Sequence, residues 1–325
     1  MRLSNILGPL HGLWLGLTLA LVPTLRAVLR APRRFLLHPE RIARVYMAHV
    51  WAGFGDGVDE GGRGEKERLI RPHAVGRVLD IGAGHGHTAR YLDRARVTQY
   101  IALEPNTLMH ARIRAEAAAA GFAEADGSLV VLACGAEDTG AILAKLSLTP
   151  TPSSPTHSPS HPSHTPPQID TLISVLTLCT VPRPARTLAS LVRSVLKPGG
   201  RFLMAEHVLS ARADVARWQR VWAPLWSVGF DGCRMDRATD VMVAGLRVGA
   251  SGGLEGEGGM EGEEGTEGWG SLEGSGGMEG KECGKGGGEG ESAWSEVRTW
   301  RQEGLDTDEG GENMFGHSYG VFVKR

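Results

Sequence analysis

One short run, residues 78–86, constrains the fold of this chain most strongly. It reads Val-Leu-Asp-Ile-Gly-Ala-Gly-His-Gly, an apolar strand that carries Asp80 and then breaks into a glycine-rich turn. Glycines at positions 82, 84 and 86 allow backbone angles and close approaches that a Cβ would forbid. We expect a helix to follow over residues 88–95. A strand, a glycine turn and a helix N-terminus form a ligand cradle, because free backbone N–H groups point into it.

The spacing of this turn argues against a bound dinucleotide and against a bound nucleoside triphosphate. Dinucleotide-binding turns read G-x-G-x-x-G, whereas here an acid precedes three glycines in alternate positions, and no Walker lysine follows. A second predicted strand, 100–103, ends in Glu104, about 24 residues after Asp80. A βαβ unit places at this point an acid that accepts both hydroxyls of a ribose. A cationic sulfonium joined to adenosine suits this arrangement better than a pyrophosphate; the alternative is an ordinary tight turn.

These residues resemble the first motif and the ribose-binding acid of the class I S-adenosylmethionine (SAM)-dependent methyltransferases. The resemblance implies that SAM is the cofactor, with Glu104 on its ribose and Asp80 orienting it. Glu137 lies where this fold contacts the edge of the adenine ring. An equal alternative is that Glu137 is a solvated acid in a loop. The predicted cofactor-binding residues are Asp80, Gly82, Ala83, Gly84, Gly86, Glu104, Pro105, Ala136, Glu137 and Thr177.

Apolar strands and amphipathic helices alternate along the rest of the chain. We expect strands over 129–133, 169–176 and 201–205, helices over 107–120 and 185–196, and a closing hairpin from 297–301 and 319–324. Residues 197–200, Lys-Pro-Gly-Gly, should separate the second helix from the next strand. This order predicts an α/β, Rossmann-like class I methyltransferase fold, with a seven-stranded, mostly parallel sheet and helices on both faces.

Composition restricts the partners and the compartment. The formal charge of −2 argues against a nucleic-acid binder that relies on a basic field. The four cysteines form no C-x-x-C pair, so the sequence indicates neither a zinc site nor a disulfide framework, and no metal is expected. Residues 148–168 (rich in Thr, Pro, Ser and His) and 252–291 (rich in Gly and Glu) have too few apolar side chains for a core, so we expect disordered insertions.

The N-terminal segment is an apolar stretch that carries no Asp, Glu, Lys or Arg over residues 6–25. Its 20 residues are long enough to cross a hydrocarbon core as a helix, and Arg26, Arg30, Arg33 and Arg34 follow it. Only Arg2 precedes the apolar segment, so positive charge is concentrated on its C-terminal side. Because positively charged flanks stay in the cytosol, this places the downstream domain on the cytosolic side. A cleaved signal peptide fits less well, and a helix lying in one leaflet stays open. We expect a membrane anchor over 1–45 and a methyltransferase domain over 46–325.

Several further blocks resemble the membrane-anchored thiol S-methyltransferases, the methyltransferase-like seven family. They include Leu-Cys-Thr-Val at 178–181, Glu-His-Val at 206–208, Phe-Asp-Gly-Cys at 230–233 and His-Ser-Tyr-Gly at 317–320. The resemblance implies methyl transfer from SAM to a small lipophilic acceptor, such as a thiol. It also implies a place at an endoplasmic-reticulum or lipid-droplet surface. The alternatives are a ubiquinone-type C-methyltransferase and a non-catalytic SAM-binding membrane scaffold.

Two residues are candidates for the acceptor chemistry. A thiol reacts as its thiolate, so a nearby base or cation assists transfer. His207 follows a predicted central strand and is the first candidate, and Asp231 is the second; each has a structural alternative, a loop hydrogen bond or a turn cap. Trp218, Trp222 and Trp226 share one helical face, which either packs or walls an acceptor pocket. Cys179 and Cys233 are interpreted as small buried hydrophobic residues.

Overall fold

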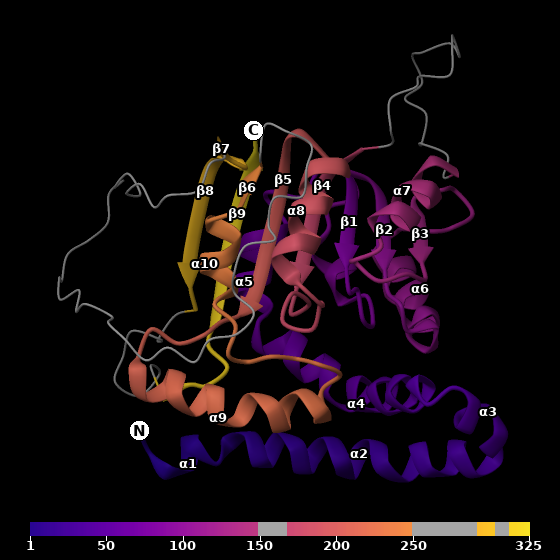
Figure 1. Cartoon of the computed structure of the whole chain (residues 1–325). Helices are drawn as coiled ribbons and strands as arrows, with labels where there is room; N and C mark the ends of the chain where they lie inside the picture. The colour runs from indigo at the N-terminus through magenta and orange to yellow at the C-terminus, as the bar shows by residue number, and fades with distance from the viewer. Residues whose placement is uncertain (149–167, 249–290, 303–311) are drawn as a thin grey trace.

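The computed structural model describes residues 1–148, 168–248, 291–302 and 312–325. Seven strands form one sheet in the order β3-β2-β1-β4-β5-β9-β8 (Figure 1). Strands β1 to β5 are parallel to one another, and β9 is antiparallel to both of its neighbours. The strands are β1 (Gly76–Ile81), β2 (Val97–Leu103), β3 (Leu129–Leu132), β4 (Ile169–Val175), β5 (Leu196–His207), β8 (Trp294–Arg301) and β9 (His317–Lys324). Two short strands, β6 (Arg247–Val248) and β7 (Glu291–Ser292), pair separately.

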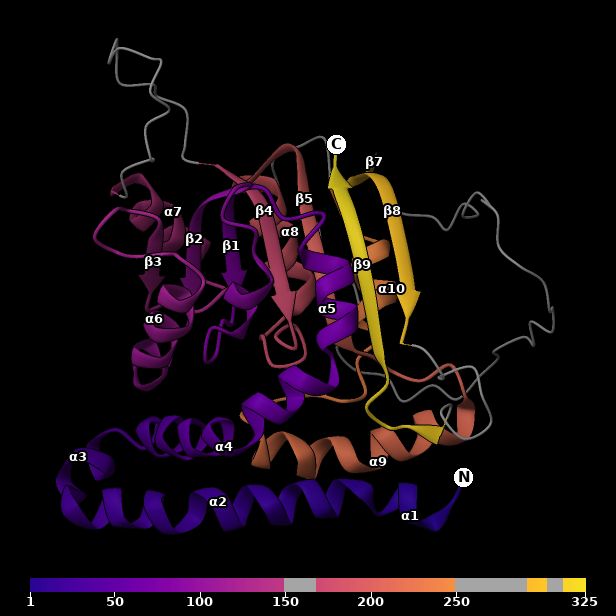
Figure 2. The same ribbon diagram turned by 180° about the vertical axis from the view of Figure 1, so that it is seen from behind.

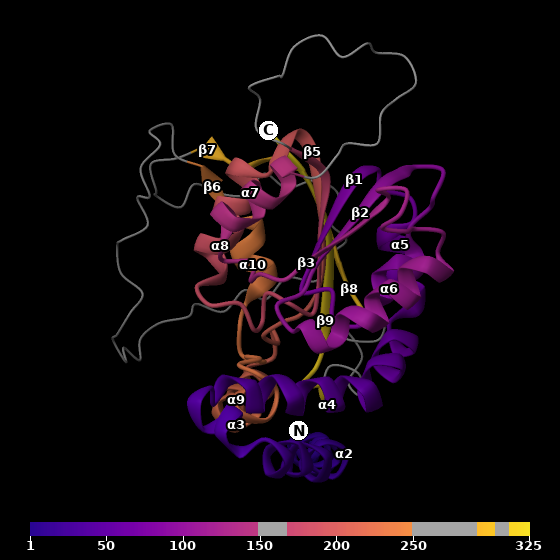
Figure 3. The ribbon, with the colours of Figure 1, turned by 90° about the vertical axis from the view of Figure 1, so that its right-hand side faces the viewer.

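Helices cover both faces of the sheet (Figure 3). On one face lie α7 (Thr139–Leu148), α8 (Pro184–Ser194) and α10 (Thr239–Ala244); on the other lie α5 (Arg63–Ile70) and α6 (His110–Ala119). Side chains of β1 alternate between the two cores: Leu79 and Ile81 join the first, and Val78 joins the second. The predicted α/β fold, with its continuous apolar strands, is therefore confirmed.

A third layer of helices lies across the carboxyl ends of the parallel strands, whose arrowheads point toward it in Figure 2. It contains α2 (Gly8–Arg30), α4 (Glu40–Gly61) and α9 (Ala213–Gly229), with the short α1 (Leu3–Ile6) and α3 (Pro32–Leu37). The predicted boundary between residues 45 and 46 falls inside α4, so the domain division stays a prediction. The N-terminal apolar helix therefore packs along the domain at the edge of the sheet where open α/β folds bind ligands.

Two local predictions were wrong in their details. The helix expected over 88–95 is only a 3₁₀ segment, η1 (His87–Tyr91), because Leu92 is already extended and β2 begins at Val97. The separator expected at 197–200 lies inside β5, which begins at Leu196 and shifts register there; Gly199 has a φ of +70°. The closing hairpin is confirmed as β8 and β9. Both predicted insertions lie almost wholly outside the described residues.

Candidate cofactor and acceptor site

The glycine turn after β1 has the backbone that its sequence predicts. Gly82, Gly84 and Gly86 have φ values of +64°, +55° and +84°, in the left-handed region. A Cβ on Gly82 would lie 2.5 Å from Thr177 Oγ1, and one on Gly86 would lie 2.9 Å from Cα of Ile113. Around Gly84, in contrast, no described atom lies within 4 Å of such a Cβ. The turn therefore packs tightly at both ends and is open in the middle.

Glu104, at the end of β2, reaches this turn. Its carboxylate accepts hydrogen bonds from the backbone N–H of Gly84 at 2.9 Å and of Asn106 at 2.8 Å. Burial raises the pKa of Glu104 to about 7, although these two hydrogen bonds lower it. Asp231 lies near enough for its charge to raise this pKa further. The predicted ribose acid is thus held against the glycine turn.

Asp80 is buried beneath the same turn. Its Oδ2 accepts a hydrogen bond from the Tyr100 hydroxyl at 2.8 Å. Burial raises the pKa of Asp80 to about 7, although the nearby Tyr100 and Thr88 side chains lower it. Within the described part of the chain, Oδ1 makes no hydrogen bond. A buried polar atom without a partner is uncommon, so this oxygen is a candidate for contact with a ligand. The sequence did not predict a role for Tyr100, because it lies on β2 and outside the glycine motif that contains Asp80.

The remaining predicted cofactor residues lie at the carboxyl ends of the neighbouring strands. Pro105 is exposed after β2, and Ala136 is buried after β3. Glu137 is exposed, and its carboxylate folds over Gly135, where a Cβ would lie 2.3 Å from Oε1. Ala83, buried in the turn, donates its N–H to Leu103 O at 2.9 Å. The parallel sheet gathers these residues along one edge, but their contacts with a ligand stay predictions.

Thr177 follows β4 and contacts the carboxyl end of β1. Its hydroxyl donates to Ile81 O at 2.9 Å, so it shapes the turn through the backbone. The N–H groups of Thr177 and Leu178 donate to Oε1 of Glu206, at 2.9 and 3.0 Å. Glu206 is fully buried and also accepts from the Ser174 hydroxyl at 2.6 Å. This carboxylate, not singled out as a site residue from the sequence, positions the loop after β4.

His207 ends β5 and faces two thiols. Its Nε2 lies 3.6 Å from Cys233 Sγ, which lies 3.5 Å from Cys179 Sγ. The interaction with the Cys179 thiol lowers the pKa of Cys233 to about 5, against the effect of burial, and His207 lowers it further. Burial lowers the pKa of His207, but Cys233 and Glu206 reverse this and raise it. The interpretation of these cysteines as plain hydrophobic residues therefore misses a thiol–imidazole cluster.

Asp231 follows α9 in a left-handed conformation, with a φ of +49°. It precedes Gly232, whose N–H donates to Ser227 O at 2.8 Å and so helps to end the helix. Burial raises the pKa of Asp231, and Arg44 lowers it. Its backbone thus has the structural role of a helix end, while its carboxylate interacts with Glu104 of the cradle.

The three tryptophans on one face of α9 differ in burial. Trp226 is buried and stacks on Phe230, with ring centroids 4.0 Å apart, and it contacts Phe315 at 4.7 Å. A Cβ on Gly12 of α2 would lie 3.0 Å from the Trp226 ring. Trp218 and Trp222 are half-buried. Trp226 is therefore a packing residue between α9, α2 and the apolar surroundings of Cys233.

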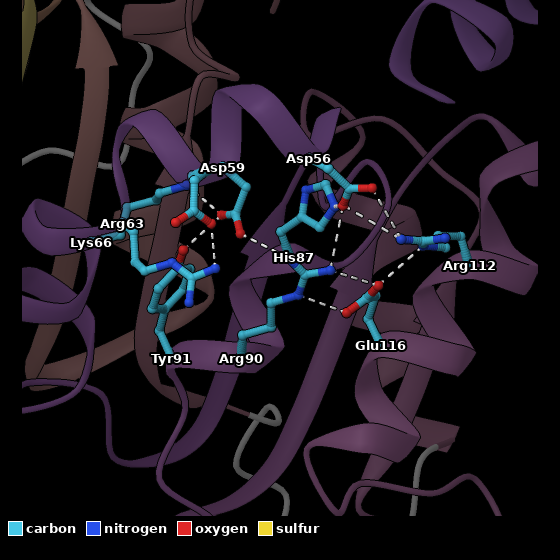
Figure 4. A network of polar contacts seen from close by, with 10 residues as sticks. Asp56, Asp59, Arg63, Lys66, His87, Arg90, Tyr91, Arg112 and Glu116 are labelled. Atoms are coloured by element: carbon cyan, nitrogen blue, oxygen red, sulfur yellow. Dashed lines mark hydrogen bonds and ion pairs between the residues drawn. The ribbon is translucent and has the colours of Figure 1, made fainter. Parts of the chain in front are cut away.

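A polar network attaches α4 and α5 to the cofactor half of the sheet (Figure 4). Asp59, 2% exposed, accepts from the Tyr91 hydroxyl at 2.8 Å and from Arg90 at 3.0 Å, and it pairs with Lys66. Asp56 pairs with His87 of η1 at 3.1 Å. Beside it, α4, η2 (Thr107–Met109) and α6 line an open pocket of about 420 Å³, to which His85 of the glycine turn also contributes. Helix α4 thus forms one wall next to the cradle.

The fold and this cradle define a class I, Rossmann-like methyltransferase. A methyltransferase domain model matches residues 61–241, more than half of the 325 residues. The chain therefore belongs to the methyltransferase domain family, and SAM is its methyl donor. The open turn at Gly84, the free Oδ1 of Asp80 and the buried Glu104 fit this cofactor.

Curated relatives match over a shorter stretch. The rat thiol S-methyltransferase TMT1B is 40% identical over 72 residues, 22% of this chain and 29% of that protein. The human thiol S-methyltransferase TMT1A is 39% identical over 70 residues, 21% of this chain and 28% of that protein. The chain thus spans less than a third of the length of these relatives in the matched region.

Solved structures are similar over most of the chain at low identity. The YcgJ protein from Bacillus subtilis covers 82% of this chain and 99% of its own, at 14% identity and a TM-score of 0.44. The N-methyltransferase NodS from Bradyrhizobium japonicum, in complex with S-adenosylhomocysteine, covers 81% of this chain and 86% of its own, at 10% identity and a TM-score of 0.40.

Proposed function

We propose that this chain transfers the methyl group of SAM to a small lipophilic thiol at a membrane surface. The observation that carries the proposal is the juxtaposition of the cofactor cradle with the apolar cluster around Cys233, where a second thiol, Cys179, lies 3.5 Å away. Asp231 interacts with Glu104 of the cradle, and Cys233 lies only two residues further along the chain. Two residues span at most about 7 Å. The two halves of the site are therefore adjacent.

The cradle residues have distinct roles in this proposal. Gly84 and Ala83 approach the amino-acid part of SAM through their backbone, and Asp80 orients it through the free Oδ1. Glu104 accepts the ribose hydroxyls, in place of the Gly84 N–H that it now binds. Pro105, Ala136 and Glu137 contact the edge of the adenine ring. SAM supplies an electrophilic methyl group on a sulfonium.

The acceptor side combines apolar packing with polar groups. Trp226, Phe230 and Phe315 form an aromatic cluster with Cys233, which suits a lipophilic acceptor. The name of the partly matching relatives, thiol S-methyltransferase, favours sulfur as the acceptor atom. A thiol must lose its proton to react well, and His207 and Asp231 are the candidates to assist this step. Exclusion of water and alignment for in-line attack then provide much of the rate.

Helix α2 supports attachment to a membrane surface. It is apolar and long enough to span, and only 17% of its most apolar stretch is buried. One face nevertheless packs on the domain: Gly16 lies close to the Tyr46 hydroxyl, and Leu19 and Leu13 contact Gly53 and Gly229. A helix held along its length by the domain lies in the plane of the membrane more readily than across it.

The opposite face of α2 presents an exposed apolar stripe. Its members recur every three or four residues, as one helical face requires: Leu10, Trp14, Leu17, Leu21, Leu25 and Leu29. Exposed fractions range from 44% for Leu10 to 78% for Leu29. Arg26, Arg30, Arg33 and Arg34 add positive charge that suits anionic headgroups. An endoplasmic-reticulum or lipid-droplet surface, with the domain facing the cytosol, is part of the proposal.

A methyl-transfer assay tests the acceptor. The full chain, purified in detergent and returned to vesicles, is supplied with methyl-labelled SAM and either alkyl thiols, phenols or quinols. We expect labelled thioethers from the thiols. Transfer to quinols alone would instead favour a ubiquinone-type C-methyltransferase, and SAM binding without transfer to any class would favour a scaffold.

A further inference from the structure

The cluster formed by Cys179, His207 and Cys233 has the composition and the geometry of a metal site. Cys179 follows β4, His207 ends β5 and Cys233 follows α9, so the three come from separate parts of the chain. Their ligand atoms all lie within 4.8 Å of one another. No spacing in the sequence predicts this, because only the position of α9 across the carboxyl ends of the strands (Figure 2) brings Cys233 to the other two.

We propose that Cys179, His207 and Cys233 bind a zinc ion next to the methyl-transfer site. Zinc–sulfur and zinc–nitrogen bonds of about 2.3 and 2.0–2.1 Å give a tetrahedron with edges of about 3.4–3.8 Å. The Sγ–Sγ separation of 3.5 Å and the Sγ–Nε2 separation of 3.6 Å fall in this range. The third pair, Cys179 Sγ and the His207 ring nitrogen, lies within 4.8 Å. Two of the three separations therefore match those that a zinc ion requires.

The surroundings favour a cation that prefers sulfur and nitrogen. Thiolate and imidazole ligands suit zinc, whereas magnesium and calcium prefer oxygen. Glu206 lies beside the cluster, fully buried, and its Oε2 makes no hydrogen bond within the described residues. A cation nearby compensates this buried carboxylate.

Three protein ligands leave the fourth position open, as in catalytic zinc sites. Resting on the proposed thiol acceptor, we assign this position to the acceptor sulfur. The thiol binds as its thiolate and releases its proton to water. Its sulfur then forms the new S–C bond while the C–S bond of the donor breaks, and that electron pair stays on the donor sulfur, which leaves as a neutral thioether. His207 then acts as a ligand, and no free base is needed.

Cobalt substitution tests the site directly. The full chain, purified in detergent with a phosphine reductant and freed of metal by a chelator, is titrated with Co²⁺ and then with Zn²⁺. We expect one Co²⁺ per chain with a thiolate-to-cobalt charge-transfer absorption that Zn²⁺ abolishes. Cys179→Ser or Cys233→Ser should weaken binding at least about tenfold, and the double variant should show no such band. Cys134→Ser, outside the cluster, is the matched control and should keep the band.

Two further readouts keep the test decisive. In the unchanged chain, Zn²⁺ should slow alkylation of Cys233 but not of Cys134, which requires no variant to fold. SAM binding by calorimetry is followed in parallel. A chain that binds SAM but shows neither the cobalt band nor zinc protection overturns the zinc site. A chain that binds one zinc through these residues but methylates only phenols or quinols keeps the zinc site and overturns the thiol acceptor.

Discussion

At the scale of single residues, the proposed cofactor site depends on two buried carboxylates. Asp80 and Glu104 are held at the ends of adjacent strands, and burial raises the pKa of each to about 7. Buried acids with perturbed pKa values gather at functional sites, and here a cationic cofactor would restore their charge. Their placement could be predicted from the motif, because the strand register fixes it; their protonation could not, because it depends on Tyr100 and on burial.

Asp80→Asn tests the orienting carboxylate. The amide keeps the shape but removes the charge, and a hydrogen bond to a charged group is worth about 1.5–3 kcal/mol. We expect SAM affinity to fall by about 10- to 100-fold in calorimetric titrations. Glu67→Gln, the same kind of change on an exposed position of α5, serves as the control and should leave affinity unchanged. Unaltered binding by Asp80→Asn would refute the role of this residue.

The affinity for SAM should depend on pH. Asp80 and Glu104 are protonated below a pKa of about 7 in the free protein, and the cationic cofactor binds better to their ionised forms. The dissociation constant should therefore fall as the pH rises from 6 to 8 and level off above about 7. Well below the pKa, each group that must ionise contributes up to about tenfold per pH unit. An affinity that does not change over this range would contradict the proposed coupling.

At the scale of elements, hydrophobic periodicity predicted the strands. The features that it did not predict depend on tertiary contacts. The strands of the sheet are continuous apolar runs, so β1, β2 and β4 could be placed from the sequence. The segment after the glycine turn became η1 because Gly86 packs directly on Ile113 and the chain must soon enter β2. Glu206 and the two thiols escaped prediction because no local pattern marks residues that meet only through packing.

Asp59→Asn tests the attachment of α4 and α5. Burial raises the pKa of Asp59, but hydrogen bonds from Lys66 and Tyr91 outweigh it and hold the pKa below its usual value. Removing the charge leaves the buried Lys66 uncompensated, which typically costs about 3–5 kcal/mol. We expect a loss of this size in the free energy of unfolding, measured with denaturant. Glu60→Gln, which alters the exposed pair with Arg63, should change it by less than about 1 kcal/mol.

The outer stripe of α2 should set membrane affinity. Burying one leucine is worth about 1.5–3 kcal/mol, so Leu17→Asp or Leu21→Asp should lower vesicle partitioning at least about tenfold in a flotation assay. Val297→Asp replaces an exposed apolar residue on β8 and serves as the control. Equal flotation of the stripe variants and the control would contradict attachment through α2.

At the scale of the whole molecule, the architecture places the cofactor cradle and the apolar helix α2 on the same side of the sheet. The helical layer of α2, α4 and α9 lies across the carboxyl ends of the parallel strands, where the cradle is (Figures 1 and 2). A lipophilic acceptor leaving a membrane under α2 would meet the site without crossing the sheet. The sequence could predict both the sheet and the apolar helix, but not that the helix packs along the domain, because this depends on close contacts of small residues such as Gly12 and Gly16.

Whether the full chain binds SAM is the decisive measurement. Calorimetric titration of the detergent-purified protein should show one SAM per chain, displaced by S-adenosylhomocysteine and weakened by Glu104→Gln. An absence of SAM binding by the folded, unchanged chain would contradict the account at its foundation.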